Sequence, residues 1–232
     1  MDSISGLNPQ QKAAVENING AMLILAGAGS GKTKVLTCRI AHLLELGVPP
    51  YKILAITFTN KAAKEMRSRV DAMVGSAAKD VWLYTFHAFC ARFLRSEIEI
   101  SGKYKSNFAI YDAADQKNLI KAILKDMNLD EKRFPPAALQ NAISNAKNEM
   151  LDAAAFAKLA GDFFEQKAAE VYEQYEKRLA VNNALDFDDL LMVTVKILTE
   201  YPEIREKYQK RFNYIMIDEY QDTNRTQYLL AR

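Results

Sequence analysis

Cysteine is scarce in this sequence: its 232 residues include only Cys38 and Cys90. The two lie far apart along the chain, and neither has a second cysteine or a histidine at the spacing of metal ligands. A disulfide framework and a zinc site are therefore not expected. Two reduced cysteines are typical of a cytosolic protein.

Long hydrophobic runs are also lacking. The longest, residues 21–28, is far too short to span a bilayer. The first residues contain no basic segment followed by an apolar one, so a signal peptide is not expected. We therefore expect a soluble, cytoplasmic protein with no membrane partner.

A charge excess of one sign is missing as well. The chain has 31 basic and 29 acidic side chains and a net charge of +2. A nucleic-acid partner is thus not indicated by bulk charge and would need a local basic track. The hydrophobic fraction of 49% and the charged fraction of 26% are typical of a globular protein. The length suits one large domain, or a domain with a smaller one inserted.

Four short apolar runs are predicted to be strands: Met22–Ala26, Ile53–Phe58, Val81–Phe86 and Tyr214–Ile217. Each run is continuous rather than alternating, as expected of strands buried on both faces of a parallel sheet. A polar group and a helical pattern follow each run. In open α/β sheets ligands bind beyond the carboxyl ends of the strands, where these polar groups would gather.

The segment between the third and fourth strands has a different pattern, with no convincing strand. Three helical faces are apolar: Leu119, Ile120, Ile123, Leu124 and Met127; Leu139, Ile143 and Ala146; Phe164, Ala168, Val171, Tyr175 and Leu179. We therefore predict an α/β fold in two parts. Residues 1–107 and 186–232 form one domain with a parallel sheet, and residues 108–185 form an all-helical inserted subdomain.

A glycine-rich stretch follows the first predicted strand and begins a helix. It reads Ala26, Gly27, Ala28, Gly29, Ser30, Gly31, Lys32 and Thr33. Glycines let successive backbone N–H groups turn inward around phosphate oxygens at a helix N-terminus. Lys32 would reach the β and γ phosphates, and the Thr33 hydroxyl would bind Mg²⁺. The alternative is a strand-to-helix turn without a ligand, but the Gly-Lys-Thr ending favours a phosphate loop. Ala26 stands where the usual pattern begins with glycine.

An acidic pair, Asp218 and Glu219, closes the last apolar run. We assign Asp218 to Mg²⁺ binding and Glu219 to polarising the attacking water. An Asp-Glu pair alone is more often a solvated helix cap. Its place after a phosphate loop in the chain favours the catalytic interpretation and hydrolysis of the nucleotide.

These motifs carry a family resemblance. Residues 218–224 read Asp-Glu-Tyr-Gln-Asp-Thr-Asn, and with residues 26–33 they closely resemble the UvrD/PcrA/Rep family of superfamily I DNA helicases. Further segments are similar to family motifs: 7–15, 56–63, 85–89 and 186–191. The resemblance covers essentially the whole chain.

The resemblance implies a P-loop fold of RecA type and an ATP- and Mg²⁺-dependent 3′-to-5′ translocase on single-stranded DNA and single-strand/duplex junctions. The family has two RecA-like domains, of which this chain carries the first with its helical insertion, so the second is an expected partner. The family's Q-motif implies that Gln11 reads the adenine edge. Lys34 completes the expected nucleotide contacts, although close relatives often carry arginine there.

The resemblance also implies DNA contacts, at Thr57, Phe58, Thr59, Asn60, Phe86 and His87. On residue chemistry alone, an aromatic ring at a strand end can stack on a base while hydroxyl and amide groups hold phosphates. Lys61, Lys64, Arg67 and Arg69 follow on the next helix. The alternative is that Phe58 and His87 are core residues and the charges form a solvated face.

Alternatives remain for the whole protein. The chain could be the motor half of a helicase–nuclease, or a nucleotide-dependent binding module that never translocates. Alone, it is expected to bind ATP and DNA weakly with little hydrolysis. The arginines that stabilise the transition-state charge in related P-loop enzymes, and raise the rate roughly 10³–10⁵-fold, are not expected in this chain. Asp186, Asp188 and Asp189 could form a second metal site, but a helix N-cap cluster is favoured.

Overall fold

The structure is a computed structural model and describes residues 3–27 and 29–232. The chain divides into two compact units. Unit 1 comprises Met1–Phe89 and Glu206–Asp222, and unit 2 comprises Cys90–Arg205 and Thr223–Arg232.

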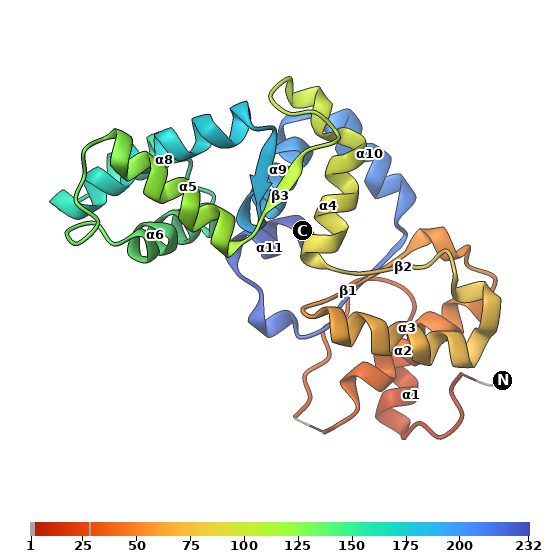
Figure 1. The fold of residues 1–232 in the computed structure, drawn as a ribbon. Coiled ribbons are helices and arrows are strands. Elements are labelled where there is room, and N and C mark those ends of the chain that lie inside the picture. Colours follow the sequence, from red (N-terminus) through yellow and green to blue (C-terminus); the bar gives the residue numbers. More distant parts are fainter. Residues whose placement is uncertain (1–2, 28) are drawn as a thin grey trace. The chain divides into compact units, whose positions relative to one another are not determined.

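A parallel sheet organises unit 1 (Figure 1). Among the described residues its strand order is β2 (Trp82–Thr85), β1 (Ile53–Thr57), β5 (Tyr214–Ile217). Every residue of the central strand β1 is buried, as a continuous apolar run predicts. These three predicted strands are confirmed. The edge strand β5 is less buried, and Ile215 is 51% exposed.

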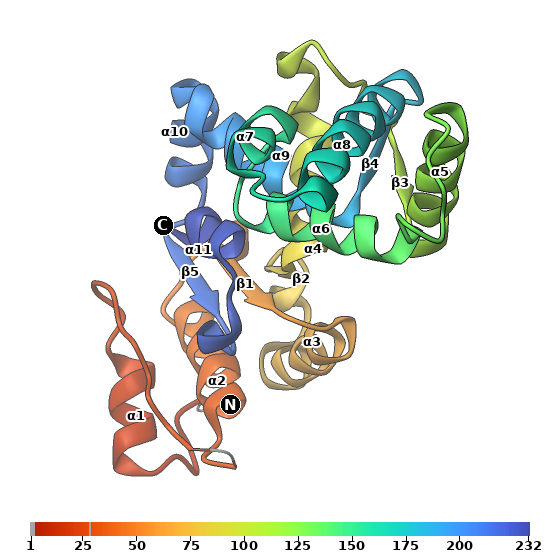
Figure 2. The ribbon, with the colours of Figure 1, turned by 90° about the vertical axis from the view of Figure 1, so that its left-hand side faces the viewer.

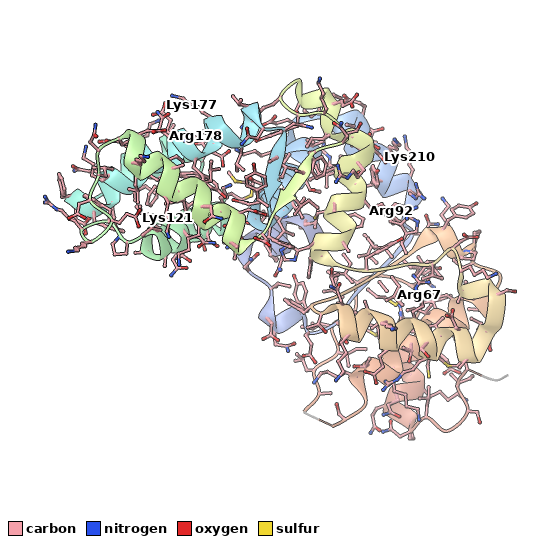
Figure 3. All side chains as sticks on the ribbon, viewed as in Figure 1. Arg67, Arg92, Lys121, Lys177, Arg178 and Lys210 are labelled. Carbon is pink, nitrogen blue, oxygen red and sulfur yellow. The ribbon has the colours of Figure 1, made fainter. Side chains whose placement is uncertain are left out.

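Helices α2 (Lys32–Glu45) and α3 (Asn60–Val74) cover one face of this sheet (Figure 2). The core between helices and sheet comprises Ile40, Leu43, Ile53, Ala55, Met66, Val70, Ala78, Val81, Leu83 and Met216. Arg67 of α3 donates to the carbonyls of Val81 at 3.0 Å and Leu83 at 3.5 Å (Figure 3). Its charge therefore fastens α3 to the β2 segment.

Unit 1 also contains α1 (Pro9–Glu16), η1 (Pro50–Lys52), η2 (Gly75–Ala78) and η4 (Tyr220–Asp222). Helix α10 (Pro202–Arg211) begins in unit 2 and ends in unit 1.

The strand predicted at Met22–Ala26 is wrong. Residues 21–27 have no regular secondary structure, and Leu23 and Leu25 are 66% and 86% exposed. A strand needs a neighbour to satisfy its backbone N–H and C=O groups, and no described strand pairs with this segment. β5 pairs only with β1 among the described residues, so its other edge is open.

Unit 2 is mostly helical. The helices are α4 (Phe86–Glu97, beginning in unit 1), η3 (Ile98–Ser101), α5 (Ala113–Asp126), α6 (Pro136–Asn148), α7 (Ala153–Leu159), α8 (Phe163–Val181), α9 (Phe187–Glu200) and α11 (Arg225–Ala231). The prediction that 108–185 is all-helical is wrong. β3 (Ala109–Tyr111) and β4 (Ala184–Asp186) pair in parallel (Figure 2). Strands of three residues give no run long enough to be recognised in sequence.

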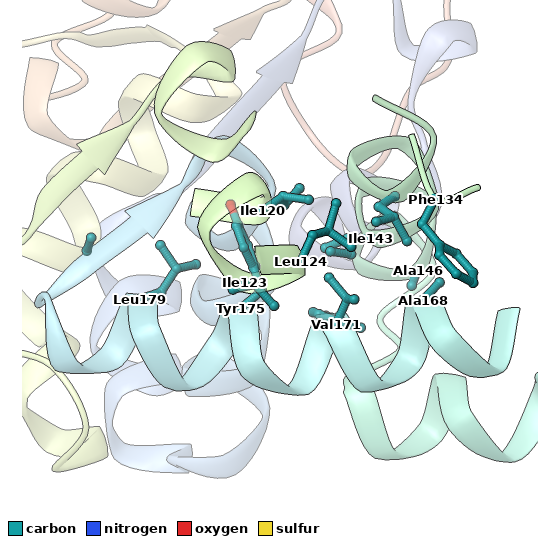
Figure 4. Close-up of a cluster of buried hydrophobic side chains, with 13 residues drawn as sticks. Ile120, Ile123, Leu124, Phe134, Ile143, Ala146, Ala168, Val171, Tyr175 and Leu179 are labelled. Atoms are coloured by element: carbon teal, nitrogen blue, oxygen red, sulfur yellow. The ribbon is translucent and has the colours of Figure 1, made fainter. Parts of the chain in front are cut away.

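The three predicted apolar helix faces form the core of unit 2 (Figure 4). Ile120, Ile123 and Leu124 come from α5, Leu139, Ile143 and Ala146 from α6, and Ala168, Val171, Tyr175 and Leu179 from α8. Leu119, Met127 and Phe164 pack against this core as partly buried residues. This part of the prediction is confirmed.

A charged cluster lies buried in unit 2. The ammonium of Lys147, on α6, is fully buried and lies 2.8 Å from Asp186, 2.7 Å from Asp189 and 2.8 Å from Glu176. Tyr175 donates its hydroxyl to Asp186 at 3.0 Å. Burial by itself would lower the pKa of Lys147, but the three carboxylates outweigh it and hold that pKa well above its usual value.

The three aspartates at the start of α9 therefore have structural partners. Asp186 is the N-cap of α9 and accepts the N–H of Asp189 at 2.8 Å, while Asp189 accepts the N–H of Asp186 at 3.1 Å. No group of three or more histidine, cysteine, aspartate or glutamate side chains that could hold a metal ion occurs in the part of the chain that the structure describes. The N-cap interpretation is confirmed.

The boundaries of the two compact units differ from those of the predicted domains. The prediction joined residues 1–107 to 186–232 and separated residues 108–185. Most of α4 and all of α9 belong with the helical unit. The predicted division into a nucleotide-binding domain and an inserted one remains a prediction. Every helix of the described residues is too short or too polar to cross a membrane.

Candidate nucleotide-binding site

The glycine-rich loop precedes α2, which begins at Lys32. Gly29 and Gly31 have φ of +75° and +85°, a left-handed conformation that side chains with a Cβ rarely adopt. A Cβ on Gly31 would also lie 3.0 Å from the side-chain nitrogen of Gln11. Glycine at position 31 thus allows both the turn and the approach of Gln11. The N-terminus of α2 opens onto this loop, as an anion site requires.

Lys32 folds back over the loop. Its ammonium donates to the carbonyls of Ala26 at 2.9 Å and Gly27 at 3.3 Å. Ser30 donates its hydroxyl to the same Gly27 carbonyl at 2.7 Å. The Lys32 ammonium therefore lies against the concave side of the loop, where phosphate oxygens would lie.

Gln11 lies beside this loop. It is residue N3 of α1, and its side-chain oxygen accepts the N–H of Asn8 at 3.0 Å in a capping box. Its side-chain nitrogen donates to the carbonyl of Ser30 at 3.0 Å. A glutamine held by its carbonyl end in this way presents its amide at the phosphate loop.

The loop and the acidic strand end come together at Thr33 and Asp218. The Thr33 hydroxyl donates to the Asp218 carboxylate at 3.3 Å, although 185 residues separate them in sequence. Asp218 is buried, and its N–H donates to the carbonyl of Ile56 at 2.9 Å, which extends the β5–β1 pairing to its position. A hydroxyl and a carboxylate at this separation are suited to hold Mg²⁺ directly or through water.

Glu219 follows with a left-handed backbone, at φ of +50°. Its side chain is exposed and accepts a hydrogen bond from the amide of Gln221.

Two hollows lie at this site, and Thr33 and Glu219 are part of the lining of both. The residues of the loop line the second hollow: Gly27, Gly29, Ser30, Gly31, Lys32, Thr33 and Lys34.

The first hollow is lined by the carboxyl end of β1 and the start of α3. Its lining includes Thr57, Phe58, Thr59, Ala62, Glu65 and Arg69. Thr57 is buried and donates its hydroxyl to the carbonyl of Thr59, and Thr59 is the N-cap of α3. Phe58 is half-buried and meets Phe86 edge-on, with ring centroids 5.5 Å apart.

The remaining predicted DNA contacts are placed differently. Asn60 is exposed in the first turn of α3, and His87 is half-buried in the first turn of α4. Phe86 is 1% exposed, so its ring has no face open to a base and instead supports Phe58. Phe58, by contrast, is half-buried and keeps an accessible surface.

Two predicted nucleotide contacts need separate mention. Lys34 is exposed and donates its ammonium to the carbonyl of Gly6 at 2.9 Å, so in this conformation it fastens the segment before α1. Ala28 lies outside the described residues.

Two further residues line the site but were not predicted as nucleotide-site residues. They are Glu65 and Arg69, which form an ion pair on α3. In the sequence, Arg69 stands out only as one of four basic residues on the helix after Phe58.

The chain was compared with known proteins. It is 52% identical to the ATP-dependent DNA helicase PcrA of Bacillus subtilis over 230 residues, which are 99% of this chain and 31% of that relative. It is 51% and 50% identical to the proteins of the same name from Staphylococcus epidermidis and Staphylococcus aureus, with the same coverage. The chain thus spans about a third of the length of these relatives. Residues 7–232 match the sequence model of the UvrD/REP helicase N-terminal domain, and the chain belongs to that family.

Proposed function

We propose that this chain is the nucleotide-binding part of an ATP-dependent 3′-to-5′ DNA helicase that couples ATP hydrolysis to movement on single-stranded DNA. The 3.3 Å contact between Thr33 and Asp218 supports this most strongly. It joins a phosphate loop to an acidic strand end, which is the arrangement that Mg²⁺-dependent NTP hydrolysis requires. The names of the PcrA relatives support the helicase assignment.

The residues have separate roles in this proposal. The loop from Ala26 to Lys34 surrounds the phosphates, with the Lys32 ammonium facing the β and γ phosphates. Gln11 donates to the adenine edge. Thr33 and Asp218 would hold Mg²⁺, which would neutralise charge on the phosphates. Glu219 accepts a proton from the attacking water.

The proposed DNA track lies at the carboxyl end of β1. Phe58 would stack on a base, while Thr59 and Asn60 would contact the phosphates. The buried Thr57 would support this turn through its hydrogen bond to the Thr59 carbonyl. His87 is a further contact, and the buried ring of Phe86 holds Phe58 in place. Single-stranded DNA and single-strand/duplex junctions are the proposed substrates.

The fold proposed for the domain is of RecA type, with residues 108–185 inserted between its strands. A second RecA-like domain is the proposed partner that completes the ATP site and the DNA track. Without it, the 232 residues should bind ATP and DNA weakly and hydrolyse little ATP, because the rate contribution of trans-acting arginines, roughly 10³–10⁵, is missing.

Lys32→Ala tests the phosphate loop. The dissociation constant for a fluorescent ATP analogue, measured with Mg²⁺ on this chain, should rise at least about tenfold because a charge-assisted hydrogen bond is worth roughly 1.5–3 kcal/mol. Lys79→Ala is the matched control, since Lys79 is an exposed lysine of unit 1 outside the site. Equal affinity of the Lys32 variant and the native chain would contradict the assignment.

Phe58→Ala tests the DNA track. Anisotropy with labelled single-stranded DNA at low salt should show binding roughly 5- to 150-fold weaker, because stacking on one base is worth about 1–3 kcal/mol. Tyr51→Ala serves as control, since that exposed aromatic lies in η1 outside the track. Single-stranded RNA and duplex DNA should bind less tightly than single-stranded DNA. If Phe58→Ala and Tyr51→Ala bind equally well, Phe58 is no DNA contact.

A further inference from the structure

Helix α1 carries Gln11 but has little apolar surface of its own. Of its eight residues only Val15 is buried, and it packs with Val35 and Cys38 of α2. A helix this short is not stable by itself in water and depends on its contacts with the rest of the fold. The position of Gln11 therefore depends on how α1 is attached to α2, which lies beside it in the same unit (Figure 2).

A buried arginine contributes to this attachment. Arg39, on α2, is 8% exposed, and its guanidinium donates to the carbonyls of Ala14 at 2.8 Å and Val15 at 3.5 Å. The same nitrogen donates to the carbonyl of Asn17, the C-cap of α1. The last carbonyls of a helix have no partners within it, and the helix dipole places partial negative charge there. Because α1 has no basic residue in its own last turn, Arg39 supplies the cation from the neighbouring helix.

The contacts at the other end of α1 cannot replace this link. The Gln11 amide, which donates to the Ser30 carbonyl at 3.0 Å, must share or release that bond when it turns to a base. The bond from Lys34 to the carbonyl of Gly6 is exposed and reaches the segment before α1 rather than the helix itself. The contacts of Arg39 involve other atoms of α1, so they hold the helix whichever partner Gln11 has.

We propose that Arg39 is a positioning residue for recognition of the adenine base. It holds the C-terminal turn of α1 against α2, and α2 begins at the phosphate loop, so the distance of Gln11 from the loop is fixed. A hydrogen bond to a base edge needs donor and acceptor within about 3.2 Å, which a helix free to shift would not maintain. The inference rests on the proposed role of Gln11 and extends it to the selectivity of the site for ATP over other nucleotides.

The test is Arg39→Met in the whole protein that contains this chain. Dissociation constants for ATP, GTP and inorganic tripolyphosphate are measured with Mg²⁺ by displacement of a fluorescent ATP analogue. Tripolyphosphate probes the phosphate loop without a base. We expect ATP to bind roughly 2- to 10-fold more weakly, the range of one hydrogen bond, and GTP and tripolyphosphate to change less than about twofold. The preference for ATP over GTP should fall by the same factor as ATP affinity.

A double-mutant cycle shows whether Arg39 acts through Gln11. Gln11→Ala alone should also reduce the preference for ATP. Adding Arg39→Met to that variant should weaken ATP binding no further, because residues that act through one contact have non-additive effects. Hydrogen exchange should become faster in α1 and stay unchanged in β1, which separates release of one helix from loss of the fold. Arg39→Lys keeps the charge and a donor, so it should restore part of the preference and provides a second variant if the first folds poorly.

Arg205→Met is the control for a lost arginine–carbonyl contact. Arg205 is exposed and donates to the carbonyl of Leu198, in the last turn of α9, at 3.3 Å. This variant should keep the native preference for ATP.

Three results would overturn the inference: a native preference for ATP in Arg39→Met, an equal loss of affinity for ATP, GTP and tripolyphosphate, or additive effects of Arg39→Met and Gln11→Ala. A purely structural residue would give the second or the third result. Gln11→Ala separates the two levels. If that variant keeps the native preference, the base-reading role in the proposed function fails. If it loses the preference while Arg39→Met keeps it, only the positioning inference fails.

Discussion

Lys147→Met is expected to lower the free energy of unfolding by roughly 3–5 kcal/mol, because it leaves buried carboxylates without their cation. Methionine fills a similar volume, so the loss reports charge rather than a cavity. Asp186 and Asp189 are almost fully buried and have the Lys147 ammonium as their ion-pair partner. Thermal unfolding of this chain should show a melting temperature lower by about 10 °C.

The loss of unfolding free energy in Lys147→Met should depend on pH. Burial raises the pKa of Asp189 well above its usual value, and the charge of Lys147 opposes that rise. Without the lysine, Asp189 takes up a proton more readily in the folded state than in the unfolded one, so stability should recover as pH falls from 7 towards 5. In the native chain the raised pKa of Lys147 stabilises the fold at neutral pH, and this contribution is lost in alkali, above about pH 10.4.

Lys177→Met is the control for this experiment (Figure 3). Lys177 pairs with Glu173 at 2.7 Å, but both side chains are 59% exposed, so its removal should change stability by less than about 0.5 kcal/mol. A Lys147 variant with the melting temperature of the native chain would show that the buried ion pairs contribute no net stability. A loss of stability that is the same at pH 5 and pH 7 would show that uncompensated carboxylate charge is not its cause.

Glu219→Gln is expected to lower kcat for ATP hydrolysis by roughly 10²–10⁴-fold in the whole protein, the usual contribution of a general base. Glutamine keeps the size of the side chain but cannot accept a proton. Affinity for the ATP analogue should be nearly unchanged, since the phosphate contacts come from the glycine-rich loop and Lys32. Steady-state hydrolysis with single-stranded DNA, together with nucleotide titration, measures both quantities.

Glu203→Gln provides the comparison, because Glu203 is an exposed glutamate in the first turn of α10. Its hydrolysis rate should equal that of the native protein. A Glu219 variant that retains most of its kcat would move the catalytic base elsewhere, and a variant that loses nucleotide affinity would mean that Glu219 contacts the nucleotide.

Elements whose signal lies in consecutive residues could be predicted from the sequence. β1 is a run of buried apolar residues, the core faces of α5, α6 and α8 follow the helical period, and the glycine-rich loop carries its own chemistry. The approach of Thr33 to Asp218 could also be anticipated, because both follow strand segments expected at one end of a parallel sheet.

Other features depend on tertiary partners and could not be predicted. Residues 22–26 have a strand-like composition, but no strand among the described residues pairs with them, so composition alone was misleading. Lys147 is an ordinary-looking lysine in an amphipathic helix, and only the fold shows that its carboxylate partners come from α8, β4 and α9. The hydrogen bond between Asn148 and Asn224, the N-cap of α11, likewise joins residues 76 positions apart, without any motif that links them.

The open edge of β5 has a consequence for work with this chain in solution. On this edge no described strand pairs with the backbone of β5, whose residue Ile215 is half-exposed, and the apolar residues Leu23 and Leu25 are exposed elsewhere in unit 1. An unprotected strand edge of this kind is a template for pairing with a second molecule. Concentrated samples should therefore tend to self-associate, and binding constants for nucleotide or DNA are best measured at low protein concentration.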